Sequence, residues 1–172
     1  MRRLGAALNV EAMSLYAHVG SKDELLDRLG DRVMHEVVMP NGPDSVQSAM
    51  ELARGFRATL LAHPNLMPVL ARRRTGPSDP GLTKRNVALA FARDAGLDPD
   101  FAVIAYMTIV SFVAGHVITH TGLLGADASR DDLEGPDPDR AFEEGLAAIV
   151  DGLLSRAGDR ERLREVSSVH RS

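Results

Sequence analysis

The first three dozen residues carry the pattern that most constrains the fold of this chain. Leu4 and Leu8 lie four positions apart, so they share one face of a short helix. Asn9 follows, and asparagine readily adopts the left-handed conformation that ends a helix. A second short helix is expected over residues 11–18, with Leu15 facing inward. Two short helices joined by a tight turn are typical of a helix-turn-helix.

A helix-capping pattern comes directly after this pair. Ser21 and Glu24 have the S-x-x-E spacing of a capping box, in which each side chain satisfies a backbone N–H at the start of a helix. We therefore expect a longer helix over residues 22–39, and its apolar stripe consists of Leu25, Leu29, Val33 and Val37. The Pro-Asn-Gly-Pro segment at residues 40–43 then predicts a domain boundary.

The segment RRLGAALNVEAMSLYAHVGSKDELLD closely resembles the DNA-binding region of TetR-family transcriptional repressors. The specific part of the match is an L-Y-x-H-V-x-x-K core, formed by Leu15, Tyr16, His18, Val19 and Lys22. The resemblance implies an all-α protein with a helix-turn-helix head over residues 1–39. A helical effector-binding and dimerisation domain over residues 44–157 and a tail over residues 158–172 would follow.

The resemblance also indicates a head that is shorter than usual. The family's DNA-binding domain has three helices, and this sequence begins at the second. We therefore expect Leu4, Leu8 and Leu15 to lack the cover that the first helix supplies.

The resemblance implies DNA contacts position by position. Arg2 falls where family members place an arginine that reaches a guanine edge or a phosphate, and the start of the second short helix would meet base edges. Tyr16, His18 and Lys22 match positions that hold phosphates. The full set expected to contact operator DNA is Arg2, Arg3, Ala12, Met13, Ser14, Tyr16, His18 and Lys22.

Charge and composition are compatible with such a regulator. The net charge of −4 is unusual for a nucleic-acid-binding protein, but residues 1–22 hold two arginines and a lysine against only Glu11. A basic face on an acidic body limits non-specific adhesion to DNA. The absence of cysteine excludes disulfides and thiolate metal sites, and no signal-peptide pattern follows the first arginines, so a cytoplasmic location is expected.

Residues 101–119 form an apolar run without a formal charge. Such a run is long enough to span a bilayer. However, polar side chains such as Tyr106 and Ser111 dilute it, and no cluster of Lys or Arg flanks it. We therefore expect no membrane association but a helix buried on nearly all sides of a soluble bundle. This helix and the last one, expected over residues 137–157 and ended by Gly158, are predicted to form a homodimer interface.

The family resemblance also implies a small-molecule cavity. Its expected walls favour a flat or branched apolar effector, with His63 and Ser111 as polar anchors. The residues expected to line it are Phe56, Leu60, His63, Met67, Leu70, Phe91, Met107, Val110 and Ser111. Family members that bind metal-chelated tetracycline use a histidine where this chain has Leu70, so that metal ligand is missing.

Neither a metal site nor an enzyme is predicted. His116 and His120 have the H-x-x-x-H spacing of zinc enzymes, but Val117 stands where the catalytic glutamate belongs and no third ligand is near. No set of nucleophile, base and orienting group is visible, and no cofactor is expected. The sequence thus predicts a ligand-responsive repressor of operator DNA. The alternative is a small-molecule-binding homodimer that has lost operator binding.

Overall fold

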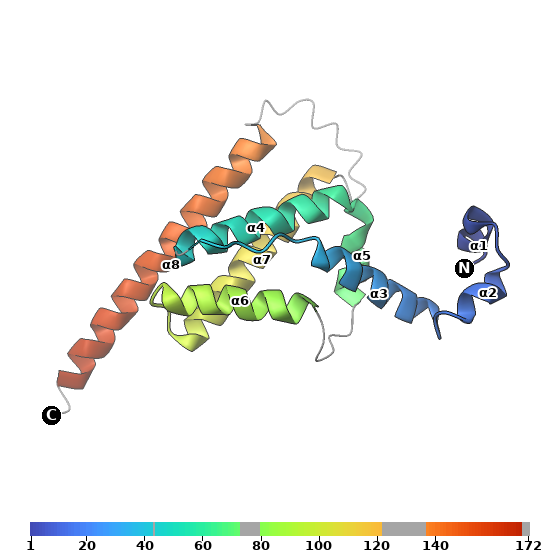
Figure 1. Cartoon of the computed structure of the whole chain (residues 1–172). Helices are drawn as coiled ribbons and strands as arrows, with labels where there is room; N and C mark the ends of the chain where they lie inside the picture. The colour runs from blue at the N-terminus through green and yellow to red at the C-terminus, as the bar shows by residue number, and fades with distance from the viewer. Residues whose placement is uncertain (43, 73–79, 122–136, 170–172) are drawn as a thin grey trace.

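The computed structural model describes residues 1–42, 44–72, 80–121 and 137–169, and every regular element in these ranges is a helix. Figure 1 shows a body of packed helices and a small head, joined by α3. In chain order the elements are α1 (Arg2–Leu8), α2 (Ala12–Tyr16), α3 (Lys22–His35), α4 (Ser45–Ala62), the 3₁₀ turn η1 (Pro64–Leu66), α5 (Met67–Arg72), α6 (Pro80–Asp94), α7 (Pro99–Thr121) and α8 (Pro138–Val169).

The head has the expected helix-turn-helix form. Asn9 ends α1 in the left-handed conformation, with φ of 55° and ψ of 41°. Gly5 permits the tight turn that follows, because a Cβ at this position would lie 2.8 Å from the carbonyl oxygen of Val10. The α1–α2 pair lies at the far end of α3 from the body (Figure 1).

The start of α3 confirms the predicted cap, with one difference. The Ser21 hydroxyl accepts a hydrogen bond from the Glu24 backbone N–H at 3.0 Å. The Glu24 carboxylate, however, accepts from the backbone N–H of Gly20 at 2.7 Å, one residue before the cap. The expected continuation of this helix to residue 39 is wrong, because α3 ends at His35. Two β-branched residues, Val37 and Val38, follow, and such side chains disfavour further helix.

The core of the body forms where α4, α7 and α8 pack together. Leu60 of α4, Val113 of α7 and Leu146 of α8 are all fully buried, and Phe142 is almost so. An ion pair between Arg54 and Glu143 links α4 to α8 at the surface, with two guanidinium nitrogens bonded to one carboxylate. The full buried cluster comprises Val33, Ala53, Leu60, Leu66, Val113, Val117, Phe142, Leu146 and Val150.

Helix α7 is apolar on all sides but is buried on only part of its surface. Val103, Ile104 and Met107 are 48%, 50% and 54% exposed, so the expectation of burial on nearly all sides is wrong. By length and composition α7 could also cross a membrane. Its other sides pack on α4, α6 and α8, which is the arrangement of a core helix with one open face.

Helix α8 continues well past Gly158 to Val169, so the predicted end at Gly158 is wrong. A glycine inside a helix costs only about 0.5–1 kcal/mol relative to alanine, and good helix formers follow it here. The extension is also held by tertiary contacts. The Arg160 guanidinium lies 5.1 Å from the ring centroid of Phe101, and its Nε lies 3.6 Å from a carboxylate oxygen of Asp98.

Two glycines of α8 provide a test of this packing. A Cβ at Gly145 would lie 2.7 Å from the Phe112 ring, which cannot easily retreat because it stacks on Phe142. A Cβ at Gly158 meets nothing within 4 Å. We expect Gly145→Ala to lower the free energy of unfolding by about 1–3 kcal/mol and Gly158→Ala to raise it by about 0.5–1 kcal/mol. Urea unfolding monitored by circular dichroism measures both, and equal effects would contradict this packing.

Candidate DNA-binding head and ligand cavity

The residues predicted to contact DNA all lie in the head or at the first position of α3. Arg2 and Arg3 begin α1 and are exposed. Met13, Ser14 and Tyr16 are exposed on α2, as are His18 and Lys22 after it. Ala12 is half-buried, because its backbone lies close to Gly5. The structure therefore leaves all of the predicted contact side chains except that of Ala12 freely accessible.

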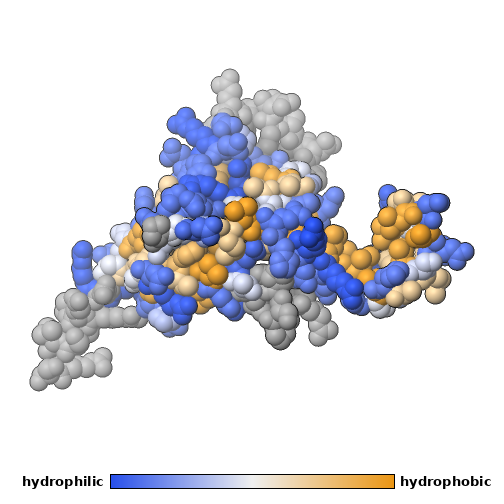
Figure 2. Space-filling model, viewed as in Figure 1, coloured by the Kyte–Doolittle hydropathy of each residue, from blue (hydrophilic) through white to orange (hydrophobic). Residues whose placement is uncertain are grey.

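The head also exposes apolar side chains. Leu8, Val10 and Met13 are 57%, 44% and 73% exposed, and Leu4 is 37% exposed. Figure 2 shows the resulting hydrophobic surface on the head. Exposed apolar residues gathered in so small a unit are typical of a surface that packs against another element or a partner.

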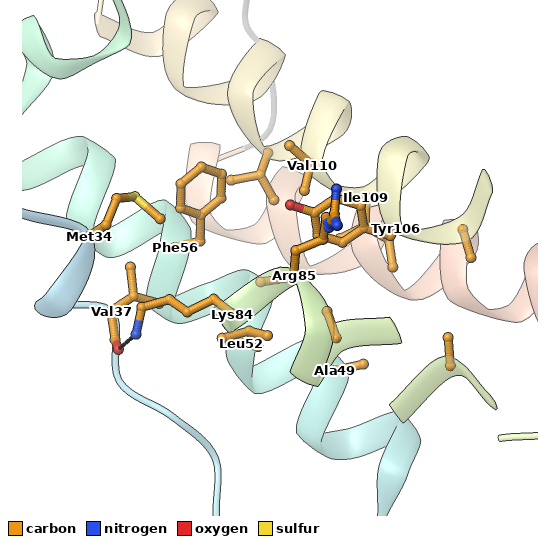
Figure 3. A pocket seen from close by; sticks show the side chains of 15 residues that line it. Met34, Val37, Ala49, Leu52, Phe56, Lys84, Arg85, Tyr106, Ile109 and Val110 are labelled. Carbon is orange, nitrogen blue, oxygen red and sulfur yellow. Dashed lines mark hydrogen bonds between the residues drawn. The ribbon is translucent and has the colours of Figure 1, made fainter. Parts of the chain in front are cut away.

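The body contains an apolar cavity of about 140 Å³. Figure 3 shows its walls, which come from α3, α4, α6 and α7 and from the segment after α3. Phe56 and Val110 were predicted to line it, and both do. The remaining lining residues are Met34, Val37, Ala49, Leu52, Ala53, Lys84, Arg85, Ala88, Ala92, Ala105, Tyr106, Ile109 and Val113.

The other predicted lining residues lie elsewhere. Leu60 is fully buried in the core, and Met67 and Leu70 pack against that core. His63 Nε2 lies 2.7 Å from the Glu36 carboxylate.

The helical period explains two further differences on α7. Tyr106 and Val110 face the cavity, and the next residue along the chain is turned about a quarter of the way round the helix. Met107 and Ser111 are therefore exposed on the outer side of α7. Phe91 of α6 is half-buried and does not line the cavity.

Sequence reasoning missed the two cations of the cavity. The Lys84 ammonium donates a hydrogen bond of 2.8 Å to the backbone carbonyl of Val37, marked by the dashed line in Figure 3. Burial lowers the pKa of Lys84. Arg85 also contributes to the lining, and no residue of the lining set is a carboxylate. The available signal was the Lys-Arg pair that precedes the apolar stretch of α6, with Asn86 between the pair and the stretch.

The histidine pair forms a second cluster, outside the cavity. The rings of His116 and His120 stack with centroids 4.1 Å apart, and the Phe142 ring lies 5.1 Å from that of His116. Burial, helped by the charges of His120 and Arg57, lowers the pKa of His116 to about 4. Within the described residues no three His, Asp or Glu side chains are grouped as a metal site would need.

Comparisons with known proteins agree with this geometry. Residues 40–136 match the family model of the tetracycline repressor-like C-terminal domain. A tetracycline repressor protein of class A from Escherichia coli is 33% identical, over 90% of this chain and 81% of that protein. The chain belongs to the TetR family.

Two further relatives support that assignment. The repressor DrrR1 of Streptomyces coeruleorubidus is 32% identical over 89% of this chain and 68% of that protein. ActR from Streptomyces coelicolor, whose crystal structure in complex with actinorhodin is known, is 30% identical to this chain in sequence. The two structures have a TM-score of 0.73, and the match covers 92% of this chain and 88% of ActR. TetR-family members are non-enzymatic transcription regulators and soluble cytoplasmic proteins, so α7 is a core helix.

The position of His116 makes stability depend on pH. In the unfolded chain a histidine binds its proton near pH 6.5, whereas folded His116 binds it only near pH 4. Between these values the unfolded state binds more protons, so stability falls as the pH falls through this window. Asp139 opposes the shift, but burial, His120 and Arg57 outweigh it.

We expect His116→Phe to lose less stability between pH 7 and pH 5 than the unmodified protein, as measured by urea unfolding at both values. His18→Gln, at an exposed position of the head, serves as the control. An unchanged pH dependence in His116→Phe would contradict this role.

Proposed function

We propose that this TetR-family protein is a ligand-responsive repressor that binds operator DNA as a homodimer and is released by a small, largely apolar effector. The observation that carries the proposal is that α3 connects the head to the cavity. This helix begins at Lys22, the last of the predicted DNA-contacting residues. At its other end Met34 lines the cavity, as does Val37 two residues beyond the helix.

This arrangement couples the cavity to the head. A ligand that widens the cavity pushes on the end of α3, while α4 and α7 form the opposite walls. A shift of α3 changes the distance between the two heads of a dimer. An effector that prefers the shifted state therefore lowers the population that fits the operator.

The relatives support an aromatic or polycyclic class of effector. ActR is known in complex with actinorhodin, and a TetR variant from Acinetobacter baumannii is known in complex with minocycline. In this chain the cavity as it stands holds about one benzene-sized ring. A larger effector must open it, which is the kind of displacement that the coupling requires.

The outer face of α7 is the proposed dimer interface. Its exposed side chains Val103, Ile104 and Met107 are apolar, and Gly115 continues the same side without a side chain. On α8 the exposed Ala148 and Gly152 are small enough to let another helix approach closely. Two copies of each helix would form a four-helix bundle across a two-fold axis.

We expect Ile104→Glu to convert the dimer to a monomer, because the charge would be buried without a partner in the interface. Sedimentation equilibrium at micromolar concentration measures the change. The control is Val38→Glu, which adds the same charge at a residue that is 74% exposed and lies outside the proposed interface, and it should leave the dimer intact. Leu153 is unsuitable for this test because it packs against the buried Phe101 cluster. A monomeric unmodified protein, or a dimer unaffected by Ile104→Glu, would refute the interface.

The exposed apolar residues of the head lead to a prediction about the affinity for duplex DNA. We expect residues 1–172 to bind duplex DNA weakly, and an added N-terminal amphipathic helix that covers Leu4 and Leu8 to strengthen binding. In that extended protein Arg2→Ala should relax base preference by about 1–3 kcal/mol. Lys22→Ala should weaken binding to all sequences and reduce the salt slope by about 1.

Fluorescence anisotropy with operator duplexes selected from a random library gives these affinities. A control variant, Arg93→Ala, removes the same charge from an exposed position on α6. Tight, salt-sensitive operator binding by residues 1–172 alone would contradict the need for cover. Failure of the extended protein to bind any duplex would favour the alternative function, a ligand-binding homodimer without an operator.

A further inference from the structure

The cavity is lined in part by positively charged side chains, and binding of an apolar ligand would not require them. Lys84 is half-buried, and its pKa is lowered because burial removes water from the ammonium. Among the described residues no carboxylate pairs with it, and its one hydrogen bond is to the neutral carbonyl of Val37. Arg85, the next residue, adds a second cation to the same lining.

A purely structural role for Lys84 does not explain these features well. Capping a single carbonyl at the end of α3 needs one donor, and a neutral amide supplies that without the cost of dehydrating a charge. An ammonium has three N–H donors, so two remain for another acceptor. A half-buried cation without a carboxylate partner is well placed to bind an anion.

We propose that the effector of this protein is a small aromatic acid, whose ring occupies the apolar cavity and whose anionic group binds Lys84 and Arg85. This inference rests on the proposed function of the cavity and specifies the class of ligand. The apolar walls exclude water from the ring, and Phe56 and Tyr106 provide aromatic surface. An anionic group bound at Lys84 would also lie close to the Val37 carbonyl, which follows the helix that leads to the head.

A matched pair of ligands separates charge from shape. 2-Naphthoate and 2-naphthamide have the same ring system and nearly the same size, so both must open the cavity beyond one ring to the same extent, but only the first is an anion. Isothermal titration calorimetry with each compound gives two dissociation constants for the full chain. We expect the unmodified protein to bind 2-naphthoate at least about tenfold more tightly than 2-naphthamide, the scale of one charge-assisted hydrogen bond.

Three variants locate the source of that preference. Lys84→Gln should reduce it to about twofold or less while the affinity for the amide stays within about twofold, which shows that the cavity is intact. Lys84→Arg keeps the charge and should keep the preference. Arg93→Gln removes a charge from an exposed position on the same helix that does not line the cavity, and should change neither constant.

The outcomes are distinct. A preference for the acid that is lost in Lys84→Gln and kept in Lys84→Arg and Arg93→Gln supports the inference. Equal affinities in the unmodified protein, or a preference that survives Lys84→Gln, overturn it while leaving an effector cavity for neutral ligands. Binding of neither compound also overturns it, and the operator measurements then decide the proposed function independently.

Discussion

The arrangement of the body depends on the burial of α7, a helix of 23 residues that carries no formal charge from Phe101 onward. Because such a helix is costly to expose, other elements must cover it, and α4, α6 and α8 do so. The inner side of α7 serves two purposes, and its outer side stays open. Val113 and Val117 lie in the core, Tyr106, Val110 and Val113 line the cavity, and Ile104 lies on the open side. A ligand that displaces α7 thus acts on the core and on the open side together.

The proposed communication between the cavity and the head depends on a different contact. Helix α6 reaches the end of α3 through the hydrogen bond from Lys84 to Val37, while α3 carries the head at its other end. Val37 itself is 3% exposed and lies outside any helix, so its carbonyl has no partner within a helix. A single side chain of the cavity therefore satisfies a backbone group of the connector.

Much of this fold is predictable because local rules and tertiary packing agree. The capping serine at Ser21, the left-handed Asn9 and the start of α4 at Asp44 all follow from short-range hydrogen bonding. The end of α8 was not predictable in that way. Glycine often ends a helix, so an end at Gly158 was expected. Contacts of Arg160 with Phe101 and Asp98, however, add stability to the continued helix.

The candidate site was less predictable than the helices. Residue type identifies apolar faces, but a helix that is apolar all round gives no sign of which side meets a cavity. Met107 and Val110 are both apolar and lie one turn apart on α7, yet only Val110 lines the cavity, whereas Met107 is exposed. Lys84 was missed for a related reason, since a lysine is expected at the surface unless its partner is known. Here that partner is a backbone carbonyl 47 residues away.

Thermodynamic linkage offers the most direct test of coupling between cavity and head. The affinity for 2-naphthoate is measured by equilibrium dialysis for the extended protein, first alone and then saturated with its operator. If ligand binding lowers the affinity for the operator, operator binding must lower the affinity for the ligand by the same factor. We therefore predict that 2-naphthoate binds the DNA-bound protein at least about fivefold more weakly than the free protein. Equal affinity in both states would contradict the coupling.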